Sequence, residues 1–170
     1  MKKTGPCKTN VIRLLQSAGI SFTVKEYPVD EGDLSAVHAA RFLDIPLERV
    51  FKTLVLRGDS GAHFVCCIPA AAEVDLKKAA RAFGEKSARL IPVRELLPLT
   101  GYLRGGCSPL GMKKQFPLFI DGTAELFDSI GVSAGQRGVQ VVLAPADLAG
   151  LTGARFSDLT GVTPSRRNPP

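Results

Sequence analysis

Apolar residues recur along this chain at two spacings, and each spacing predicts one kind of element. Apolar residues three and four positions apart share one face of a helix, and this spacing is found in five segments: 9–18, 35–43, 75–83, 92–97 and 145–150. Short alternating or β-branched runs are typical of strands, and there are six of these: 22–27, 53–57, 63–68, 118–121, 129–133 and 139–144.

Residues that begin and end helices stand at the edges of these segments. Ser35 and Asp75 precede two of the helices, where a side-chain oxygen can accept from free N–H groups. Gly19 and Gly84 follow helices, where a left-handed residue is favoured. The turn at 58–61 (Gly-Asp-Ser-Gly) predicts that the two strands beside it form a hairpin.

Two of the helices have a predicted buried face. In 9–18 it consists of Val11, Leu14, Leu15 and Ala18. In 75–83 it consists of Leu76, Ala79, Ala80 and Phe83, with Lys77, Lys78 and Arg81 facing away.

The mixed order of helices and strands predicts an α+β, or mixed α/β, architecture and argues against a doubly wound sheet. There is no internal repeat and no linker-like segment, so we expect a single domain over 9–162. Residues 1–8 are expected to form a flexible leader. Residues 163–170, rich in proline and basic side chains, are expected to be disordered.

Composition narrows the class of protein and of partner. The 170 residues are 45% hydrophobic and carry a formal net charge of +6, a modest excess that favours a polyanionic partner or is simply a solvated basic surface. No run of apolar residues approaches the length of a membrane span, and Met-Lys-Lys at the start is not followed by the apolar core of a signal peptide. We therefore expect a cytoplasmic protein that does not enter a membrane.

Cofactor and metal motifs are absent from the sequence. The four cysteines contain no C-x-x-C pair and there are only two histidines, so no metal site is expected. Neither the dinucleotide G-x-G-x-x-G pattern nor a P-loop is found, so no cofactor is expected.

The segment 101–111 contains four glycines and Pro109. Glycine adopts backbone conformations closed to other residues and lets a ligand approach the main chain. Such a loop can offer backbone N–H groups to a carbonyl oxygen or oxyanion. The alternative is an elaborate turn that joins a helix to a strand.

An ordered set of segments resembles the YbaK-type family of aminoacyl-tRNA deacylases, relatives of the editing domain inserted in bacterial prolyl-tRNA synthetases. The matching segments are 22–27, 50–54, 75–78, 100–102, 105–111 and 132–138. The resemblance implies a curved, barrel-like mixed β-sheet surrounded by helices. It also implies a trans-editing enzyme that removes cysteine wrongly attached to tRNA(Pro), with the aminoacylated tRNA 3′ end as substrate and prolyl-tRNA synthetase as a possible partner.

The same resemblance implies chemistry without a nucleophile from the enzyme, because the thiol of the substrate attacks its own ester. Alternatives remain: a deacylase of the same superfamily specific for alanine or serine, or a non-catalytic module that binds tRNA or a synthetase. The oligomeric state is not predicted.

Site residues follow from the resemblance together with the residue chemistry. The expected catalytic residues are Lys52, Gly105, Gly106 and Ser108. The expected substrate-binding residues are Tyr27, Thr53, Cys107, Ser133 and Arg137.

Several of these residues also have a purely structural interpretation. In a strand, Phe51 and Lys52 face opposite sides, which predicts Phe51 in the core and Lys52 in a cleft; the alternative is a surface lysine at a strand edge. Cys107 lacks a histidine in its own motif, so we expect loop packing rather than nucleophilic attack. Gln140 stands where several relatives carry an acidic residue suited to binding the substrate amino group, which leaves amino-acid specificity open.

Overall fold

The computed structural model describes residues 7–161. The predicted leader 1–8, except for residues 7 and 8, and the predicted tail 163–170 lie outside the described residues. The assignment of 9–162 to a single domain stays a prediction. Across residues 7–161, every helix falls short of the length and apolar character that a bilayer crossing requires.

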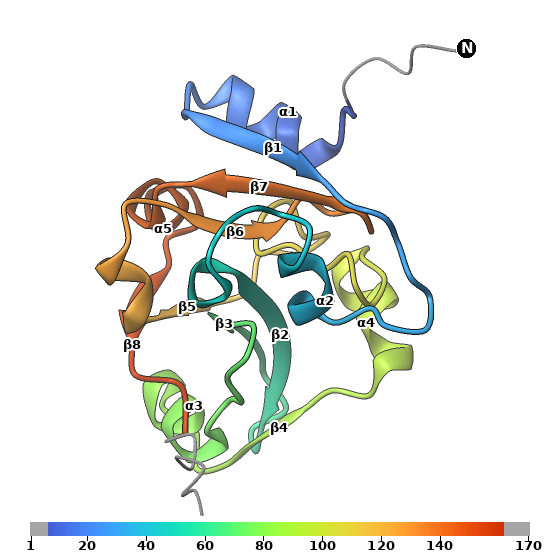
Figure 1. The fold of residues 1–170 in the computed structure, drawn as a ribbon. Coiled ribbons are helices and arrows are strands. Elements are labelled where there is room, and N and C mark those ends of the chain that lie inside the picture. The colour runs from blue at the N-terminus through green and yellow to red at the C-terminus, as the bar shows by residue number, and fades with distance from the viewer. Residues whose placement is uncertain (1–6, 162–170) are drawn as a thin grey trace, which may run out of the picture.

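Eight strands form two separate sheets (Figure 1). The first is antiparallel, with the order β1-β7-β6, and comprises β1 (Phe22–Glu26), β7 (Val139–Leu143) and β6 (Ile130–Ser133). The second has the order β4-β2-β3-β5-β8 and comprises β4 (Ala88–Leu90), β2 (Phe51–Gly58), β3 (His63–Pro69), β5 (Leu118–Asp121) and β8 (Arg155–Ser157). The β2–β3 hairpin is confirmed, whereas β5 and β8 join in parallel, so the second sheet is mixed.

The α+β architecture is confirmed, but the expected barrel-like sheet is not formed. The two sheets are open and meet at an isolated parallel bridge between Val50 and Gly131. Gly131 permits this approach because a Cβ there would lie 3.0 Å from Ile45 Cδ1 and 3.1 Å from Gln140 Oε1. Within residues 7–161, this bridge is the only backbone pairing between the two sheets.

Five α-helices and two short 3₁₀ turns surround the sheets. They are α1 (Asn10–Ser17), α2 (Ala36–Ala40), η1 (Leu47–Arg49), α3 (Leu76–Phe83), α4 (Val93–Thr100), η2 (Gly122–Leu126) and α5 (Pro145–Thr152). Figure 1 shows α1 beside the three-stranded sheet at one end of the molecule, α3 at the other end, and α2 and α4 on the side of β2.

The helix ends that were predicted from a capping residue are confirmed at Ser35, Asp75 and Gly84. Ser35 Oγ accepts from His38 N, and Asp75 Oδ1 accepts from the N–H groups of Lys77 and Lys78. Gly84 caps α3 with a φ of +73°. Gly150, in contrast, lies inside α5, which ends at the left-handed Gly153.

Three predicted buried positions are wrong, because helical spacing does not say how wide the covered face is. Leu14 and Leu76 are 38% and 40% exposed and Ala18 is exposed as well, while Ile12, left out of the predicted face of α1, is 3% exposed. The largest buried cluster lies between α1 and the two sheets and includes Val11, Leu15 and Phe51. A second cluster packs β2 and β3 against α3, with Phe83 stacked on Phe64.

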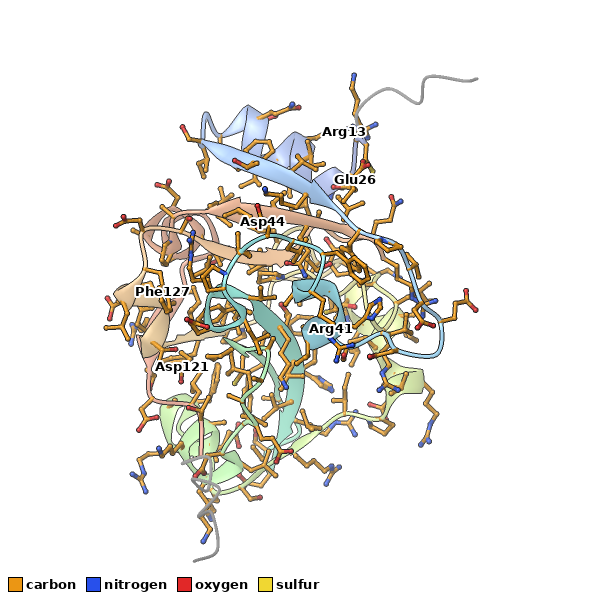
Figure 2. The ribbon with its side chains drawn as sticks, viewed as in Figure 1. Arg13, Glu26, Arg41, Asp44, Asp121 and Phe127 are labelled. Carbon is orange, nitrogen blue, oxygen red and sulfur yellow. The ribbon has the colours of Figure 1, made fainter. Side chains whose placement is uncertain are left out.

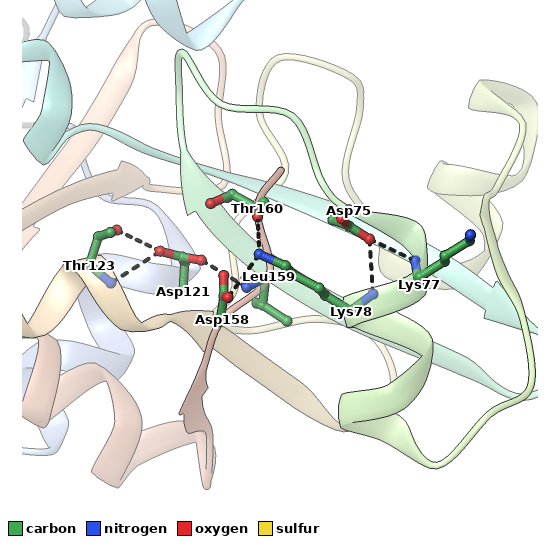
Figure 3. Close-up of polar contacts among 8 residues, drawn as sticks. All are labelled: Asp75, Lys77, Lys78, Asp121, Thr123, Asp158, Leu159 and Thr160. Carbon is green, nitrogen blue, oxygen red and sulfur yellow. Dashed lines mark hydrogen bonds and ion pairs between the residues drawn. The ribbon is translucent and has the colours of Figure 1, made fainter. Parts of the chain in front are cut away.

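The buried carboxylate of Asp121 lies at the end of β5 in the five-stranded sheet (Figure 3). Asp121 is 2% exposed; its Oδ1 accepts from the N–H and the hydroxyl of Thr123, and its Oδ2 accepts from Leu159 N. Lys78 Nζ lies 2.8 Å from Asp158 Oδ2 and donates to Thr160 O. Figure 2 shows Asp121 near Phe127, on the side of the molecule away from α4.

The two aspartates of this region should differ sharply in their effect on stability. We expect Asp121→Ala to lower the free energy of unfolding by about 2–3 kcal/mol, because it leaves buried donors without a partner. Asp158→Ala, which removes a side chain that is 72% exposed from its ion pair, should cost less than about 1 kcal/mol. Urea unfolding of both variants measures the difference, and equal losses would contradict the buried role of Asp121.

Candidate functional site

A cavity of about 480 Å³ opens beside β2, where four parts of the chain meet. Its walls come from the first half of β2, from the loop before α2, from β4 and α4, and from the glycine-rich loop. Of the nine predicted site residues, six line it: Tyr27, Lys52, Thr53, Gly105, Cys107 and Ser133. Residues from four distant stretches of sequence thus share one cavity.

Lys52 faces this cavity because β2 alternates its side chains. Phe51 is 1% exposed and belongs to the core, and Lys52 on the other side of the strand is half-buried. Within residues 7–161, Lys52 takes part in no ion pair. Burial lowers the pKa of Lys52, and the Glu73 carboxylate opposes this in part. The ammonium therefore remains available to a negatively charged or strongly polarised group of a ligand.

Gly105 allows the loop to bend over the cavity. Its φ is +86°, and a Cβ there would lie 3.1 Å from Leu34 Cβ across the cavity mouth. In the described part of the chain, the N–H groups of Gly105 and Cys107 donate to no protein acceptor. Both residues line the cavity, so the loop can offer these N–H groups to a ligand at its wall.

Gly106 and Ser108 do not line the cavity. The N–H of Gly106 donates to Leu103 O, and a Cβ on Gly106 would lie 3.1 Å from Arg137 N. Ser108 is fully buried, and its hydroxyl accepts from Leu110 N. Both residues therefore stabilise the conformation of the loop and do not line the cavity where a substrate would bind.

The Cys107 thiol is poorly suited to attack. Burial raises the pKa of Cys107 to about 12, whereas a reactive cysteine needs a lowered pKa. Neither His38 nor His63 lines this cavity. The arrangement supports a packing role for Cys107 at the cavity wall.

Arg137 also lies outside the cavity lining. Its Nε donates to the carbonyl oxygen of Arg104 at 2.8 Å, directly before Gly105. It borders a much smaller hollow that it shares with Asp30 and Asp33. Arg137 therefore holds the glycine loop in place, a role that sequence reasoning did not predict.

Gln140, like Ser35 and Arg104, is a polar residue of the cavity that the sequence did not assign to the site. It lies on β7 opposite Ser133 of β6, lines the cavity and is 4% exposed. Its Oε1 and the Thr53 hydroxyl are buried, with no hydrogen-bond partner within residues 7–161. Buried acceptors without partners are costly, and a polar ligand would satisfy them. The signal in the sequence was the departure from an acidic residue at this position.

The remaining wall is apolar and was also missed. Leu90, Ile91, Val93 and Leu96 contribute to it from β4 and α4. Residues 7–161 contain no group of three or more His, Cys, Asp or Glu side chains arranged to hold a metal. The site thus combines Lys52 and Arg104, backbone donors of the glycine-rich loop, the unpartnered oxygens of Thr53 and Gln140, and an apolar wall.

A model of the aminoacyl-tRNA editing domain matches residues 31–151, which include the whole cavity lining except Tyr27. The chain belongs to the aminoacyl-tRNA editing domain family. The matched region therefore contains the cavity lined by Lys52 and Gly105.

Relatives agree with this assignment. A protein of Enterococcus faecalis, provisionally named Cys-tRNA(Pro)/Cys-tRNA(Cys) deacylase EbsC, is 42% identical over 159 residues, covering 94% of this chain and 97% of its own. The uncharacterized protein YwhH of Bacillus subtilis is 29% identical over 140 residues, covering 79% of this chain and 88% of its own.

Solved structures share the fold of this editing domain. One, provisionally described as a trans-editing enzyme for prolyl-tRNA synthetase, has a TM-score of 0.78 at 25% identity, covering 92% of this chain and 100% of its own. The hypothetical protein APE2540 has a TM-score of 0.80 at 20% identity, covering 89% and 99%.

Substituting two glycines that have similar φ angles but different surroundings distinguishes backbone strain from a role in function. Gly101 and Gly105 both have φ above +80°, but a Cβ on Gly101 has no contact closer than 3.8 Å. We expect each change to alanine to cost about 1–2 kcal/mol of stability. Only Gly105→Ala should also slow aminoacyl-tRNA deacylation, at least about tenfold, because it displaces the loop donors. Equal deacylation rates for the two folded variants would show that the loop does not hold the substrate.

Proposed function

We propose that this editing-domain protein deacylates Cys-tRNA(Pro) in trans, acting on the acylated 3′ end of the tRNA. The observation that carries the proposal is the meeting of the Lys52 ammonium and the Gly105 loop in one cavity. The name of the Enterococcus faecalis relative and the description of the trans-editing structure support the same substrate.

The dimensions of the cavity suit this substrate. A volume of about 480 Å³ is in the range that encloses one small ligand, such as an aminoacylated nucleoside. Cysteine and proline are close in size, so a synthetase pocket gains only about 1–3 kcal/mol of discrimination between them. A second site that destroys the wrong product raises accuracy beyond that limit.

The substrate supplies the nucleophile in this proposal. Its thiol sulfur attacks the ester carbonyl, the carbonyl carbon–ribose oxygen bond breaks, and the thiol proton passes to the ribose oxygen. The products are a cyclic thiolactone and tRNA with a free terminal hydroxyl. Holding sulfur and carbonyl in contact is worth up to about 7–11 kcal/mol, so the protein needs no attacking group of its own.

Lys52 and the loop stabilise the charge that develops in this step. Lys52, Gly105 and Cys107 line the cavity, Lys52 is half-buried, and the two loop N–H groups have no backbone acceptor within residues 7–161. Preorganised donors of this kind act most strongly on an oxyanion. The half-buried Lys52 is therefore proposed as the main electrostatic residue.

Gln140 is proposed to receive the amino group of the substrate. Its unpartnered Oε1 is a neutral acceptor suited to an ammonium donor. Tyr27, Thr53 and Ser133 complete the polar wall around the ester. An amide binds the ammonium less strongly than a carboxylate would, which places more of the selectivity on the substrate thiol.

Selection of the tRNA body is proposed to come from prolyl-tRNA synthetase in a cytoplasmic complex. The cavity is large enough for the end of the tRNA only. Reading the rest of the molecule requires further surface, which a synthetase bound to the same tRNA provides.

Hydrolysis of four substrates tests the function. We expect purified protein to deacylate Cys-tRNA(Pro) at least about a hundredfold faster than Ser-, Ala- or Pro-tRNA(Pro), because only cysteine carries the attacking thiol. Cys107→Ala should keep this activity, and Gln140→Leu should raise KM. Equal rates on cysteine and serine esters would exclude the thiol mechanism. Faster hydrolysis of the alanine or serine ester would favour that specificity, and RNA binding without hydrolysis would favour a binding module.

Lys52→Met should lower the deacylation activity and raise the stability of the fold. The pKa of Lys52 is lowered in the folded state, so the unfolded chain binds more protons between that pKa and the ordinary lysine value of 10.5, and at lower pH the charged lysine weakens folding by a constant amount. The variant should therefore be more stable than the parent at pH 7, with a gain that shrinks as the pH rises towards 10.5. Its deacylation rate should fall at least about a hundredfold.

Urea unfolding at pH 7 and pH 10 measures this effect, with the exposed Lys77→Met on α3 as the control for removing a solvated charge. A Lys52→Met variant that is less stable at pH 7, or one that is fully active, would contradict the role of a half-buried ammonium.

A further inference from the structure

The mouth of the editing cavity has two unlike sides. The α4 lip consists of Leu90, Val93, Leu97 and Leu103 together with Arg94 and Arg104. The acidic lip consists of Asp30, Glu31 and Asp33, in the turn before α2. Both lips border the cavity: Val93 and Arg104 line it, and so do Leu34 and Ser35, which directly follow the acidic turn.

The α4 lip is unusually apolar for an exposed surface. Leu90, Val93, Leu97 and Leu103 are 48%, 59%, 49% and 53% exposed. Val93 and Leu97 are four residues apart and so share one face of α4. Leu90 and Val93 also line the cavity, so the exposed apolar surface continues directly from its wall. Four large apolar side chains beside a site indicate a binding surface rather than chance exposure.

The charges of the two lips are opposite. Arg94 and Arg104 are exposed and form no ion pair within residues 7–161. In the acidic lip, Asp33 accepts from Ser35 N, and hydrogen bonds from Ser35 lower the pKa of this carboxyl group, so it stays ionised. A polyanion that enters the cavity is attracted to one lip and repelled by the other.

The α4 lip is also held in place. Arg57 of β2 forms an ion pair with Glu95 of α4, and its Nε donates to His63 of β3. The Thr100 hydroxyl donates to Leu96 O in the last turn of α4 and accepts from Tyr102 N at the start of the glycine loop. The exposed side chains therefore project from a surface that is already ordered before a ligand binds.

We propose that the α4 lip carries the unpaired nucleotides that precede the acylated 3′ terminus of the tRNA. Their bases lie on the apolar side chains, and their phosphates pass Arg94 and Arg104. Single-stranded RNA is bound in this way by many proteins, through contact with base faces and basic side chains along the backbone. The inference rests on the proposed function, since it names the path of the substrate into the same cavity.

An RNA strand suits this surface better than a protein partner does. The cavity takes the last nucleoside with its ester, so the nucleotides before it leave across its rim. The acidic lip carries three carboxylates, with Arg137 bordering the same hollow as Asp30 and Asp33, whereas the α4 lip pairs apolar area with two unpaired arginines. Charge complementarity and continuity with the cavity therefore select the α4 lip.

Binding of uncharged RNA tests the inference without using catalysis. The probe is a fluorescent hairpin with an unpaired ACCA 3′ end, titrated with the full-length protein at several salt concentrations. We expect Arg94→Glu to raise Kd about five- to tenfold and to reduce the salt slope by about one. Leu97→Ser should raise Kd by a similar factor with an unchanged slope. Arg81→Glu, the same charge change on α3, is the control and should leave Kd within twofold.

A second measurement keeps the outcome distinct from that of the proposed function. Arg94→Glu should lower kcat/KM for Cys-tRNA(Pro) but leave hydrolysis of cysteinyl-adenosine, which has no preceding nucleotides, unchanged. If the protein deacylates Cys-tRNA(Pro) but Arg94→Glu and Leu97→Ser bind RNA as tightly as the parent, the proposed RNA path over the α4 lip is wrong and the proposed function stands. Loss of synthetase binding instead of RNA binding would identify a protein-docking surface and would also overturn it. If the variants lose RNA affinity as expected but the parent protein cleaves no ester, the RNA path over the α4 lip is supported and the proposed enzymatic function is excluded.

Discussion

The close approach of the two sheets at Val50 and Gly131 is the constraint on which the site depends. Val50 precedes β2, so its bridge to Gly131 decides where β2 starts relative to β6 and β7. Gly131 allows the contact because a side chain there would meet Ile45 and Gln140. With this junction in place, Lys52 and Gln140, 88 positions apart in sequence, face the same cavity.

The candidate site provides polar groups rather than a reactive cysteine. The three cysteines at or near the core, Cys66, Cys67 and Cys107, all have a pKa raised to about 12, chiefly by burial. None of them is prepared to act as a thiolate at neutral pH. What the cavity offers instead is charge, backbone donors and unpartnered acceptors, which suit a substrate that carries its own nucleophile.

These polar groups cost stability in the free protein. Gln140 Oε1 and Thr53 Oγ1 are buried without partners, and Lys52 loses part of its hydration. Such groups persist at functional sites because a ligand restores their interactions. The surrounding frame offsets the cost through its apolar core and through fully satisfied groups such as Asp121 at the far end of the sheet.

The sequence by itself determined the elements whose signals are local. Ser35 and Asp75 marked helix starts, the 58–61 turn marked the hairpin, and alternation at Phe51 and Lys52 separated core from cleft. The short strands β4 and β8 were missed because three residues acquire strand geometry only by pairing with a neighbour.

The tertiary structure alone decided which candidates share the site. Tyr27, Thr53 and Ser133 line the cavity, whereas Arg137 is turned towards the loop backbone and Ser108 is enclosed by its own turn. It also decided that Gln140 faces the cavity and that the sheets stay open. Local spacing specifies which side of a strand or helix a residue occupies, but the partner of that side is chosen by contacts between segments far apart in sequence.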